Sequence, residues 1–376
     1  MKAGWEYKKL GDVISHLRTG LNPRTHFKLN TPDADGYYIT VRELKGFAIE
    51  PDEKTDKVNS AAIKRINERS NLKIGDVLFS GTGTIGKTAL VSEIPDNWNI
   101  KEGVYAMTPN HSELDSKWFI YYIGSEFFLK LVNDKAAGTG VRSIPMKELV
   151  KLPIHLPPLS EQRSIVDYLD SAFAKIDAMK ANAEKALNEA KALFQASLKE
   201  MLEPKEGWEE KTIEHFARIV HGKNQKEVLD SNGSYPIYGS GGNIMGYANA
   251  YLCEAGTTIL GRKGTIDNPL FIDERFWNVD TAFGIIAKDN CNKKYLYYSI
   301  KKVDWAKLNT GTTLPSLTQN VVYNVAMCAP PLSEQQSIVA TLDSLKSKVD
   351  RLQANFDNIS QECDALKQAI LRQVFE

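Results

Sequence analysis

Residues 330–376 carry the clearest periodic pattern of apolar side chains. Apolar residues recur there at alternating spacings of three and four. This alternation predicts a long helix whose apolar seam packs against another helix, as in a coiled coil. We expect Ser333 to cap the start of the helix and Glu334 to place negative charge in its first turn. The predicted seam consists of Leu342, Leu345, Val349, Leu352, Phe356, Ile359, Cys363, Leu366 and Ile370.

The segment that opens this helix occurs twice. Residues 157–171 and 330–344 are identical at 12 of 15 positions, at a shift of 173 residues. The same shift predicts a second long helix, with Ser160 as its N-cap and Glu161 in its first turn. At a rise of about 1.5 Å per residue each helix would be about 60 Å long, which favours one intramolecular antiparallel pair. A coiled coil between two copies of the chain is the alternative. The large seam residues of the second helix are then Leu169, Ile176, Met179 and Leu193.

Weaker echoes extend the repeat along the chain. The shift between paired segments falls from 203 to 173 residues, so the second copy is shorter by about 30 residues. We therefore divide the chain into a head (1–155), a helix (156–205), a second head (206–329) and a second helix (330–376). The echoes include Gly4-Trp5-Glu6 with Gly207-Trp208-Glu209, Gly83-Thr84-Ile85 with Gly264-Thr265-Ile266, and Gly138-Thr139 with Gly311-Thr312.

Composition agrees with a folded protein and changes the picture little. The chain has 376 residues, 42% of them hydrophobic and 25% charged, which is enough for two domains. No apolar run approaches the roughly 20 residues of a membrane helix, and the start of the chain lacks the apolar stretch of a signal peptide. The four cysteines show no CxxC pairing, and the six histidines show no metal-ligand spacing. We expect a cytoplasmic protein without a membrane segment, metal or cofactor.

One segment invites an enzymatic interpretation. Gly81–Thr88 satisfies the phosphate-loop pattern GxxxxGK[ST], and a nucleotide-binding enzyme is therefore the alternative function. A phosphate loop requires a following helix, yet residues 89–94 are stopped by Pro95 and resemble a strand. The second copy, Gly261–Asn268, keeps the turn and loses the lysine-threonine pair. Both copies fit a strand, a Gly-rich turn and a strand, and we predict no catalytic residue.

Together these segments resemble the specificity (S) subunit of type I restriction–modification systems. The resemblance covers nearly the whole chain and depends most on the duplicated Pro-Pro-Leu-Ser-Glu-Gln-x-Ser-Ile-Val segment. It implies two α/β (α+β) target-recognition domains, related by a pseudo-twofold repeat and separated by an antiparallel two-helix coiled coil. It also implies as partners double-stranded DNA, two modification (methyltransferase) subunits and, through the complex, restriction subunits. The methyltransferase and endonuclease activities would belong to the partners, and each head would read one half of an asymmetric bipartite site.

The resemblance directs attention to polar residues on loops of the heads. Arg, Lys, Asn, Ser and Thr side chains donate to and accept from base edges, and a formal net charge of zero requires that basic faces be local. In the first head the candidates are Arg18, Thr19, Asn22, Arg24, Thr40, Arg42, Thr82, Thr84, Lys87 and Arg142. In the second head they are Lys223, Asn224, Tyr238, Ser240, Asn243, Arg262, Lys263, Thr265, Thr312 and Ser316.

Overall fold

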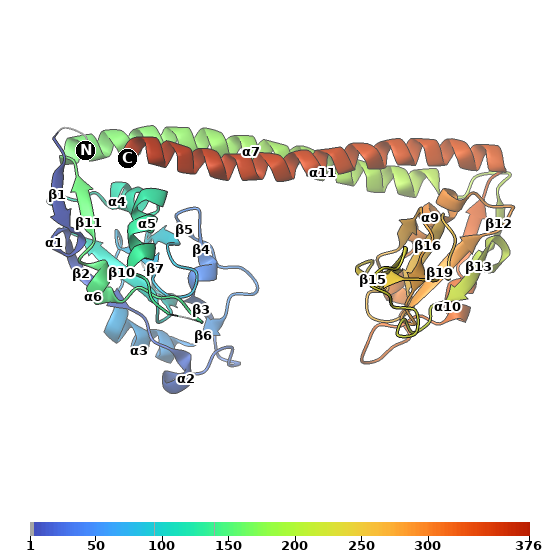
Figure 1. Cartoon of the computed structure of the whole chain (residues 1–376), viewed down its shortest axis with the longest axis horizontal. Helices are drawn as coiled ribbons and strands as arrows, with labels where there is room; N and C mark the ends of the chain where they lie inside the picture. Colours follow the sequence, from blue (N-terminus) through green and yellow to red (C-terminus); the bar gives the residue numbers. More distant parts are fainter. Residues whose placement is uncertain (1–3, 94, 139) are drawn as a thin grey trace. The chain divides into compact units, whose positions relative to one another are not determined.

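The computed structural model describes residues 4–93, 95–138 and 140–376, so Thr139 of the Gly138-Thr139 echo lies outside the described residues. The chain folds as two units, Met1–Ala181 with Asn358–Glu376, and Asn182–Asp357. Both units contain helices as well as strands (Figure 1). The predicted mixed α/β fold in two related parts is confirmed.

The first unit contains a four-stranded antiparallel sheet of order β2-β10-β7-β8. A second sheet has the order β6-β3-β9, with β3 and β9 parallel. The strand pair β1-β11 joins the beginning of this head to its end. The elements are β1 (Glu6–Lys9), α1 (Leu10–Val13), β2 (Ile14–Thr19), α2 (Pro23–His26), β3 (Gly36–Ile39), η1 (Val41–Glu43), β4 (Leu44–Lys45), β5 (Ala48–Ile49), β6 (Lys57–Val58), α3 (Ser60–Ser70), β7 (Val77–Ser80), β8 (Thr88–Leu90), β9 (Trp98–Ile100), β10 (Val104–Pro109), α4 (Ser116–Ile123), α5 (Glu126–Lys135), α6 (Met146–Leu149) and β11 (Pro153–Leu156).

The second unit repeats these pairings. Its four-stranded antiparallel sheet has the order β13-β19-β16-β17, its three-stranded sheet the order β15-β14-β18 with β14 and β18 parallel, and β12 pairs with β20. The elements are β12 (Glu209–Thr212), α8 (Ile213–Phe216), β13 (Ala217–His221), β14 (Tyr235–Tyr238), β15 (Ile244–Ala248), β16 (Thr257–Gly261), β17 (Leu270–Ile272), β18 (Trp277–Asn278), β19 (Ala282–Ala287), α9 (Lys293–Lys302), η2 (Trp305–Leu308), α10 (Gln319–Tyr323) and β20 (Ala326–Ala329).

Two long helices, α7 (Leu159–Met201) and α11 (Leu332–Phe375), follow the repeated segments. The prediction that Ser160 and Ser333 are N-caps was wrong. Both helices begin one residue before the serine, and the carbonyl of the preceding proline, Pro158 or Pro331, accepts the first helical N–H bonds. Proline suits this position because its backbone angle φ already has a helix-compatible value. Glu161 and Glu334 do lie in the first turns, as expected.

The two helices run antiparallel within each unit. In the first unit Lys367 Nζ lies 2.6 Å from Asp177 Oδ1, and Lys180 Nζ lies 3.9 Å from Asp364 Oδ1. Residue numbers therefore rise along one helix as they fall along the other. In the second unit Lys191 Nζ donates to Gln353 Oε1 at 2.8 Å.

The predicted seam was partly wrong in its phase. Met179, Leu193 and Leu366 are exposed by 61%, 58% and 48%, while Phe194, the residue after Leu193, is buried. The prediction carried one heptad phase from α11 to α7, but at this point of α7 the inward position is Phe194 and not Leu193. Among the predicted positions, Leu169, Ile176, Leu342 and Val349 are buried, and Leu345, Leu352, Phe356, Ile359 and Ile370 are half-buried.

Each helix pair completes the core of its own head. In the first unit Trp118 of α4 packs in one apolar cluster with Phe173 of α7 and Phe375 of α11. Figure 1 shows the end of α11 beside the first part of α7 in this unit. In the second unit Phe194 of α7 lies in one cluster with Tyr298 of α9 and with Leu342. The apolar faces of the helices are therefore largely occupied within the chain.

The Gly81–Thr88 segment is a turn between two antiparallel strands. β7 pairs with β8, with Val77 opposite Leu90, and the next element after β8 is the strand β9. The predicted strand-turn-strand is confirmed, and the helix N-terminus that a phosphate loop uses is missing from this described segment. In the described part of the chain, none of the helices combines the length and apolar character needed to cross a bilayer.

Candidate nucleic-acid interface

Two loops that are far apart in sequence are joined in the same way in each head. In the first head the Gly83 N–H donates to Arg142 O at 2.8 Å, and the Ile144 N–H donates to Gly81 O at 2.9 Å. These bonds tie the Gly-rich turn after β7 to the loop before α6. We call these two loops, residues 81–87 and 140–144, the first loop platform.

The second head has an equivalent pair of loops. The Gly264 N–H donates to Pro315 O at 2.9 Å, and the Leu317 N–H donates to Arg262 O at 2.9 Å. Residues 261–266 and 311–317 form the second loop platform. The structure thus pairs Thr82 with Ser143, next to Arg142, and Lys263 with Ser316, although these residues lie far apart in the sequence.

A third loop reaches each platform region through a glycine after β2 or β13. A Cβ atom on Gly20 would lie 1.7 Å from Ile100 O, and one on Gly222 would lie 1.8 Å from Val279 O. Any side chain at either position would push the loop away from the sheet. Both loops continue with an asparagine, Asn22 in the first head and Asn224 in the second.

Asn22 and Asn224 form the same local turn in the two heads. Asn22 Oδ1 accepts from the Arg24 N–H at 3.1 Å, and Asn224 Oδ1 accepts from the Lys226 N–H at 3.0 Å. The carboxamide oxygen accepts one local bond in each case, and the NH₂ group, with one further lone pair of the oxygen, is the side chain's contribution to any ligand.

The first head has a groove of about 720 Å³ beside its platform. Three exposed cations line it, Arg24, Arg69 and Lys101, together with one carboxylate, Glu102. Sequence reasoning missed Arg69 and Lys101. The position of Lys101 directly after the strand that begins with the Trp98-Asn99 pair, which recurs as Trp277-Asn278, was the available signal. The groove also takes in Thr19, Asn22 and Thr82.

Some predicted residues are occupied inside the first head. The Arg18 guanidinium, only 14% exposed, donates to Asp76 Oδ2 at 2.8 Å and to Asn71 O at 2.6 Å. Thr19 is buried, and its hydroxyl donates to Val104 O at 3.0 Å. These two side chains hold the sheet together, and we leave them out of the proposed interface.

Thr40 and Arg42 serve a buried carboxylate. Burial disfavours the charged form of Glu43, but hydrogen bonds from Thr40 and Arg42 outweigh it and lower the pKa of Glu43. Arg42 Nε donates to Glu43 Oε1 at 2.8 Å, so much of its charge is neutralised inside the head. Lys87 lies apart from the basic groove and lines another groove with Lys45 and Phe47.

In the second head the predicted residues divide in the same way. The Tyr238 hydroxyl donates to Glu274 Oε1 at 3.1 Å, and Arg262 donates to Asp280 O at 3.3 Å while its guanidinium lies over the Phe283 ring. Ser240 and Ser316 are half-buried. The exposed candidates across both heads are Arg24, Arg42, Thr82, Thr84, Lys87, Arg142, Lys223, Asn224, Asn243, Lys263, Thr265 and Thr312.

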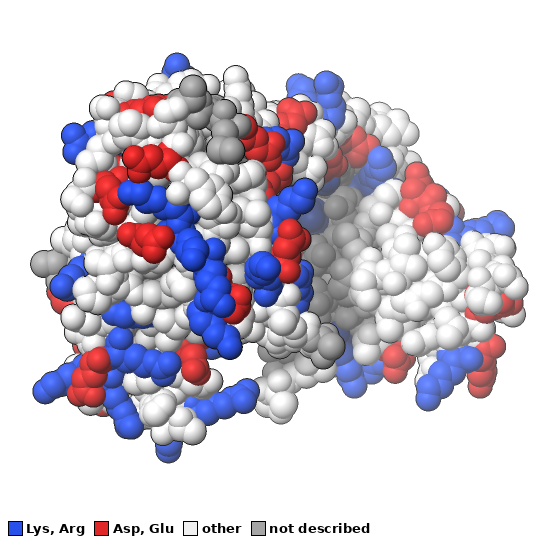
Figure 2. Space-filling view, turned by 60° about the vertical axis from the view of Figure 1, so that its left-hand side comes forward, with Lys and Arg blue, Asp and Glu red and all other residues white. Residues whose placement is uncertain are grey.

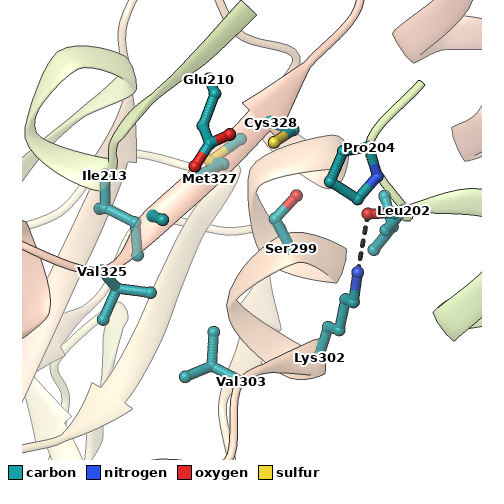
Figure 3. Close-up of a pocket in the computed structure, with 11 residues that line it drawn as sticks. Leu202, Pro204, Glu210, Ile213, Ser299, Lys302, Val303, Val325, Met327 and Cys328 are labelled. Carbon is teal, nitrogen blue, oxygen red and sulfur yellow. Dashed lines mark hydrogen bonds between the residues drawn. The ribbon is translucent and has the colours of Figure 1, made fainter. Parts of the chain in front are cut away.

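A cavity of about 270 Å³ in the second unit shows no catalytic arrangement (Figure 3). Its walls are mainly apolar, and the Lys302 ammonium donates to Leu202 O at 2.7 Å. Burial raises the pKa of the Cys328 thiol, which makes it a poor nucleophile. The Ser299 hydroxyl of the lining donates to Tyr295 O at 2.9 Å. The described residues also contain no cluster of three or more His, Cys, Asp or Glu that could hold a metal ion.

Surface charge is mixed. Figure 2 shows acidic and basic side chains interspersed over the face that it presents, with a connected band of Lys and Arg among them. Basic residues therefore gather locally while the chain as a whole is neutral. The two related heads therefore carry equivalent loop platforms, and basic side chains gather in a groove beside the first of them.

Comparison with known proteins identifies the class. The family model described as the type I restriction modification DNA specificity domain matches residues 2–189 and 205–358. The chain therefore belongs to this family of specificity subunits. Members of the family provide DNA sequence specificity, and the family is known as non-catalytic.

The relatives agree over nearly the whole chain. A putative type I restriction enzyme MjaX specificity subunit of Methanocaldococcus jannaschii is 24% identical, covering 92% of this chain and 88% of the relative. The type I restriction enzyme MjaVIII specificity subunit of the same organism is 23% identical, covering 92% and 87%.

Solved structures share the fold. One, from a study of complex assembly and conformational transition of the type I R-M system, aligns with a TM-score of 0.74 at 18% identity, covering 100% of this chain and 98% of that one. The HsdS subunit of Thermoanaerobacter tengcongensis aligns with a TM-score of 0.54 at 18% identity, covering 100% and 97%. Nothing in these comparisons supports the nucleotide-binding alternative.

Proposed function

We propose that each head reads one half of a bipartite, asymmetric DNA site through its loop platform and the asparagine loop beside it. The observation that carries this proposal is the pair of equivalent backbone bonds that builds the same platform in both heads. Equivalent side chains on the two platforms differ, Thr82 and Arg142 against Lys263 and Pro315, so the two half-sites should differ in sequence.

The long helices would dock two modification (methyltransferase) subunits. Their buried seams are used within the chain, but Tyr168, Met179, Leu193 and Leu366 remain exposed apolar side chains on the helices. Exposed apolar groups of this kind suit a protein partner better than DNA. Methyl transfer and, where restriction subunits join, cleavage would then be carried out by the partners in the cytoplasm.

Deleting this chain from its host should remove one split methylation motif from the genome. The motif should consist of two different half-sites with an unspecified spacer, because two unlike heads would each read one half. Methylation profiling by long-read sequencing of the parent and the deletion strain measures this directly. A methylome that is identical in both strains would contradict the proposed function.

Removing the three cations of the groove in the first head should weaken DNA binding by the assembled complex and flatten its salt dependence. For the variant with Arg24, Arg69 and Lys101 all replaced by Ala, the slope of log K against log salt should fall by about 2–3, since each phosphate contact contributes about 0.9. The slope is obtained by measuring, from low to high salt, the binding of a fluorescent duplex that carries the motif identified by methylation profiling.

The matched control removes the same number of charges from the same head outside the groove. Lys64, Lys130 and Lys135 are exposed and do not line it. The variant with all three lysines replaced by Ala should keep the wild-type slope to within about 0.9, which is the contribution of one phosphate contact. An equal fall in both variants would mean that net charge, and not this groove, contacts the phosphates.

A further inference from the structure

The repeated segment contains a glutamine that is buried in both copies. Gln162 is 0% exposed and Gln335 is 1% exposed, at the same shift of 173 residues. Glutamine is usually exposed in folded proteins, so two buried glutamines at equivalent positions require a reason. Side chains this deeply buried are out of reach of another protein, so partner docking does not explain why they are repeated.

Each glutamine joins its long helix to its own head. Gln162 Oε1 accepts from the Asp115 N–H at 2.8 Å, and its Nε2 donates to Glu113 O at 2.7 Å and to Pro157 O at 2.8 Å. One acceptor bond and both N–H donors of the carboxamide are thereby used. The side chain links the head loop, the proline turn and the first helical turn of α7.

Gln335 makes the same three bonds in the second unit. Its Oε1 accepts from the Asn292 N–H at 2.7 Å, and its Nε2 donates to Asn290 O at 3.4 Å and to Pro330 O at 2.9 Å. Asp115 and Asn292 are the N-caps of α4 and α9. The glutamine therefore holds the start of the corresponding helix in each head.

A second polar contact lies two helical turns further along in the first unit. Asp170 accepts from Lys117 Nζ at 2.7 Å and from the Tyr121 hydroxyl at 2.5 Å. Burial disfavours its charged form, but these two bonds outweigh it and lower the pKa of Asp170. The head helix α4 is thus fixed at its N-terminus and again one turn on.

The equivalent contact in the second unit has the same chemistry. Asp343 accepts from Lys294 Nζ at 2.7 Å and from the Tyr298 hydroxyl at 2.6 Å. Two separated attachment points prevent a rigid helix from pivoting about either one. The head helix in turn packs on the four-stranded sheet whose strands lead into the loop platform.

We infer that Gln162 and Gln335, supported by Asp170 and Asp343, are positioning residues that fix the orientation in which each head presents its reading loops. This inference rests on the proposed function, because it assigns a purpose to the orientation of the heads. Repetition of the segment then reflects a shared attachment of head to helix. The two attachments act independently, one for each half-site.

The test replaces each glutamine with methionine, which keeps the length of the side chain and removes all three hydrogen bonds. Gln336→Met is the matched control. Gln336 directly follows Gln335 and is exposed. It is not part of the repeat, because Arg163 occupies the equivalent position in the first copy. Each variant is assembled with the modification subunit. Its methylation rate is measured on duplexes with the wild-type motif and on duplexes with single changes in either half-site.

For each half-site, discrimination is the ratio of the methylation rate on the wild-type motif to the rate on a motif with a single change. We expect Gln335→Met to lower this ratio about tenfold for one half-site and Gln162→Met to lower it about tenfold for the other. Gln336→Met should keep both ratios. A purely structural role would reduce the amount of active complex and leave each ratio unchanged, because unfolded heads methylate nothing. Circular dichroism and gel filtration identify any glutamine variant that does not fold. Asp170→Asn then replaces Gln162→Met, and Asp343→Asn replaces Gln335→Met, because asparagine keeps the bond from the tyrosine hydroxyl and removes the charge. We expect these variants to lower the discrimination ratio about threefold.

Unchanged ratios in folded glutamine variants would overturn the positioning role, as would equal losses in both half-sites from one variant. A wild-type complex that marks no split motif would instead overturn the proposed function. The two failures are therefore separated by the wild-type measurement.

Discussion

Replacing Phe194 with Asp is expected to unfold the second unit, whereas the same change at Leu193 is expected to leave it folded. Phe194 is 4% exposed and lies in the apolar core with Tyr298 and Leu342, while its neighbour Leu193 is 58% exposed. Removing a buried phenyl ring costs about 3–5 kcal/mol, and burying an unpaired carboxylate adds to this. The sum is comparable to the whole stability of many domains.

Hydrogen–deuterium exchange followed by mass spectrometry measures this effect segment by segment. Peptides from β16 and β19 should lose protection in Phe194→Asp and keep it in Leu193→Asp, because exposed substitutions usually change stability by less than about 0.5 kcal/mol. Equal loss of protection in both variants would return Leu193 to the seam that the sequence predicts and would refute the phase observed for α7.

Replacing Arg18 with Met is expected to destabilise the first unit by about 3–5 kcal/mol without changing how the complex discriminates between DNA sequences. The Asp76 side chain is fully buried and accepts from Arg18, from the Thr108 hydroxyl and from the Lys73 N–H at 2.8 Å. Without the guanidinium its charge is left buried and uncompensated, which is the usual cause of losses of this size.

Urea unfolding monitored by circular dichroism gives the change in free energy. Arg24→Met is the control, since Arg24 is exposed at the groove, and it should change stability by less than about 0.5 kcal/mol while weakening DNA binding. The double variant Arg18→Met, Asp76→Asn should recover part of the lost stability, because it removes the uncompensated charge. A stable Arg18→Met protein that binds DNA poorly would place Arg18 in the interface after all.

The exposed and the occupied candidates could not be separated from the sequence. Arg18 and Arg24 stand six residues apart and look equally suitable for DNA contact, yet Arg18 pairs with Asp76, 58 residues away, and Arg24 is exposed at the groove. Arg69 and Lys101 escaped notice because the groove that collects them is built from segments that lie far apart in sequence.

By itself the sequence determined the duplication, the two long helices, the strand-turn-strand at Gly81–Thr88 and the family. These features follow from local patterns: heptad spacing, proline before a helix and glycine in a turn each act over a few residues. Periodicity could also show that α7 has an apolar seam.

Only the tertiary structure decided which way that seam faces, which polar side chains are used internally, and what the buried glutamines of the repeated Pro-Pro-Leu-Ser-Glu-Gln segment bind. Each of these depends on a partner distant in sequence, such as the head backbone that Gln162 and Gln335 bind. Such partners are chosen by packing and by the need to satisfy buried polar groups, which local periodicity does not encode.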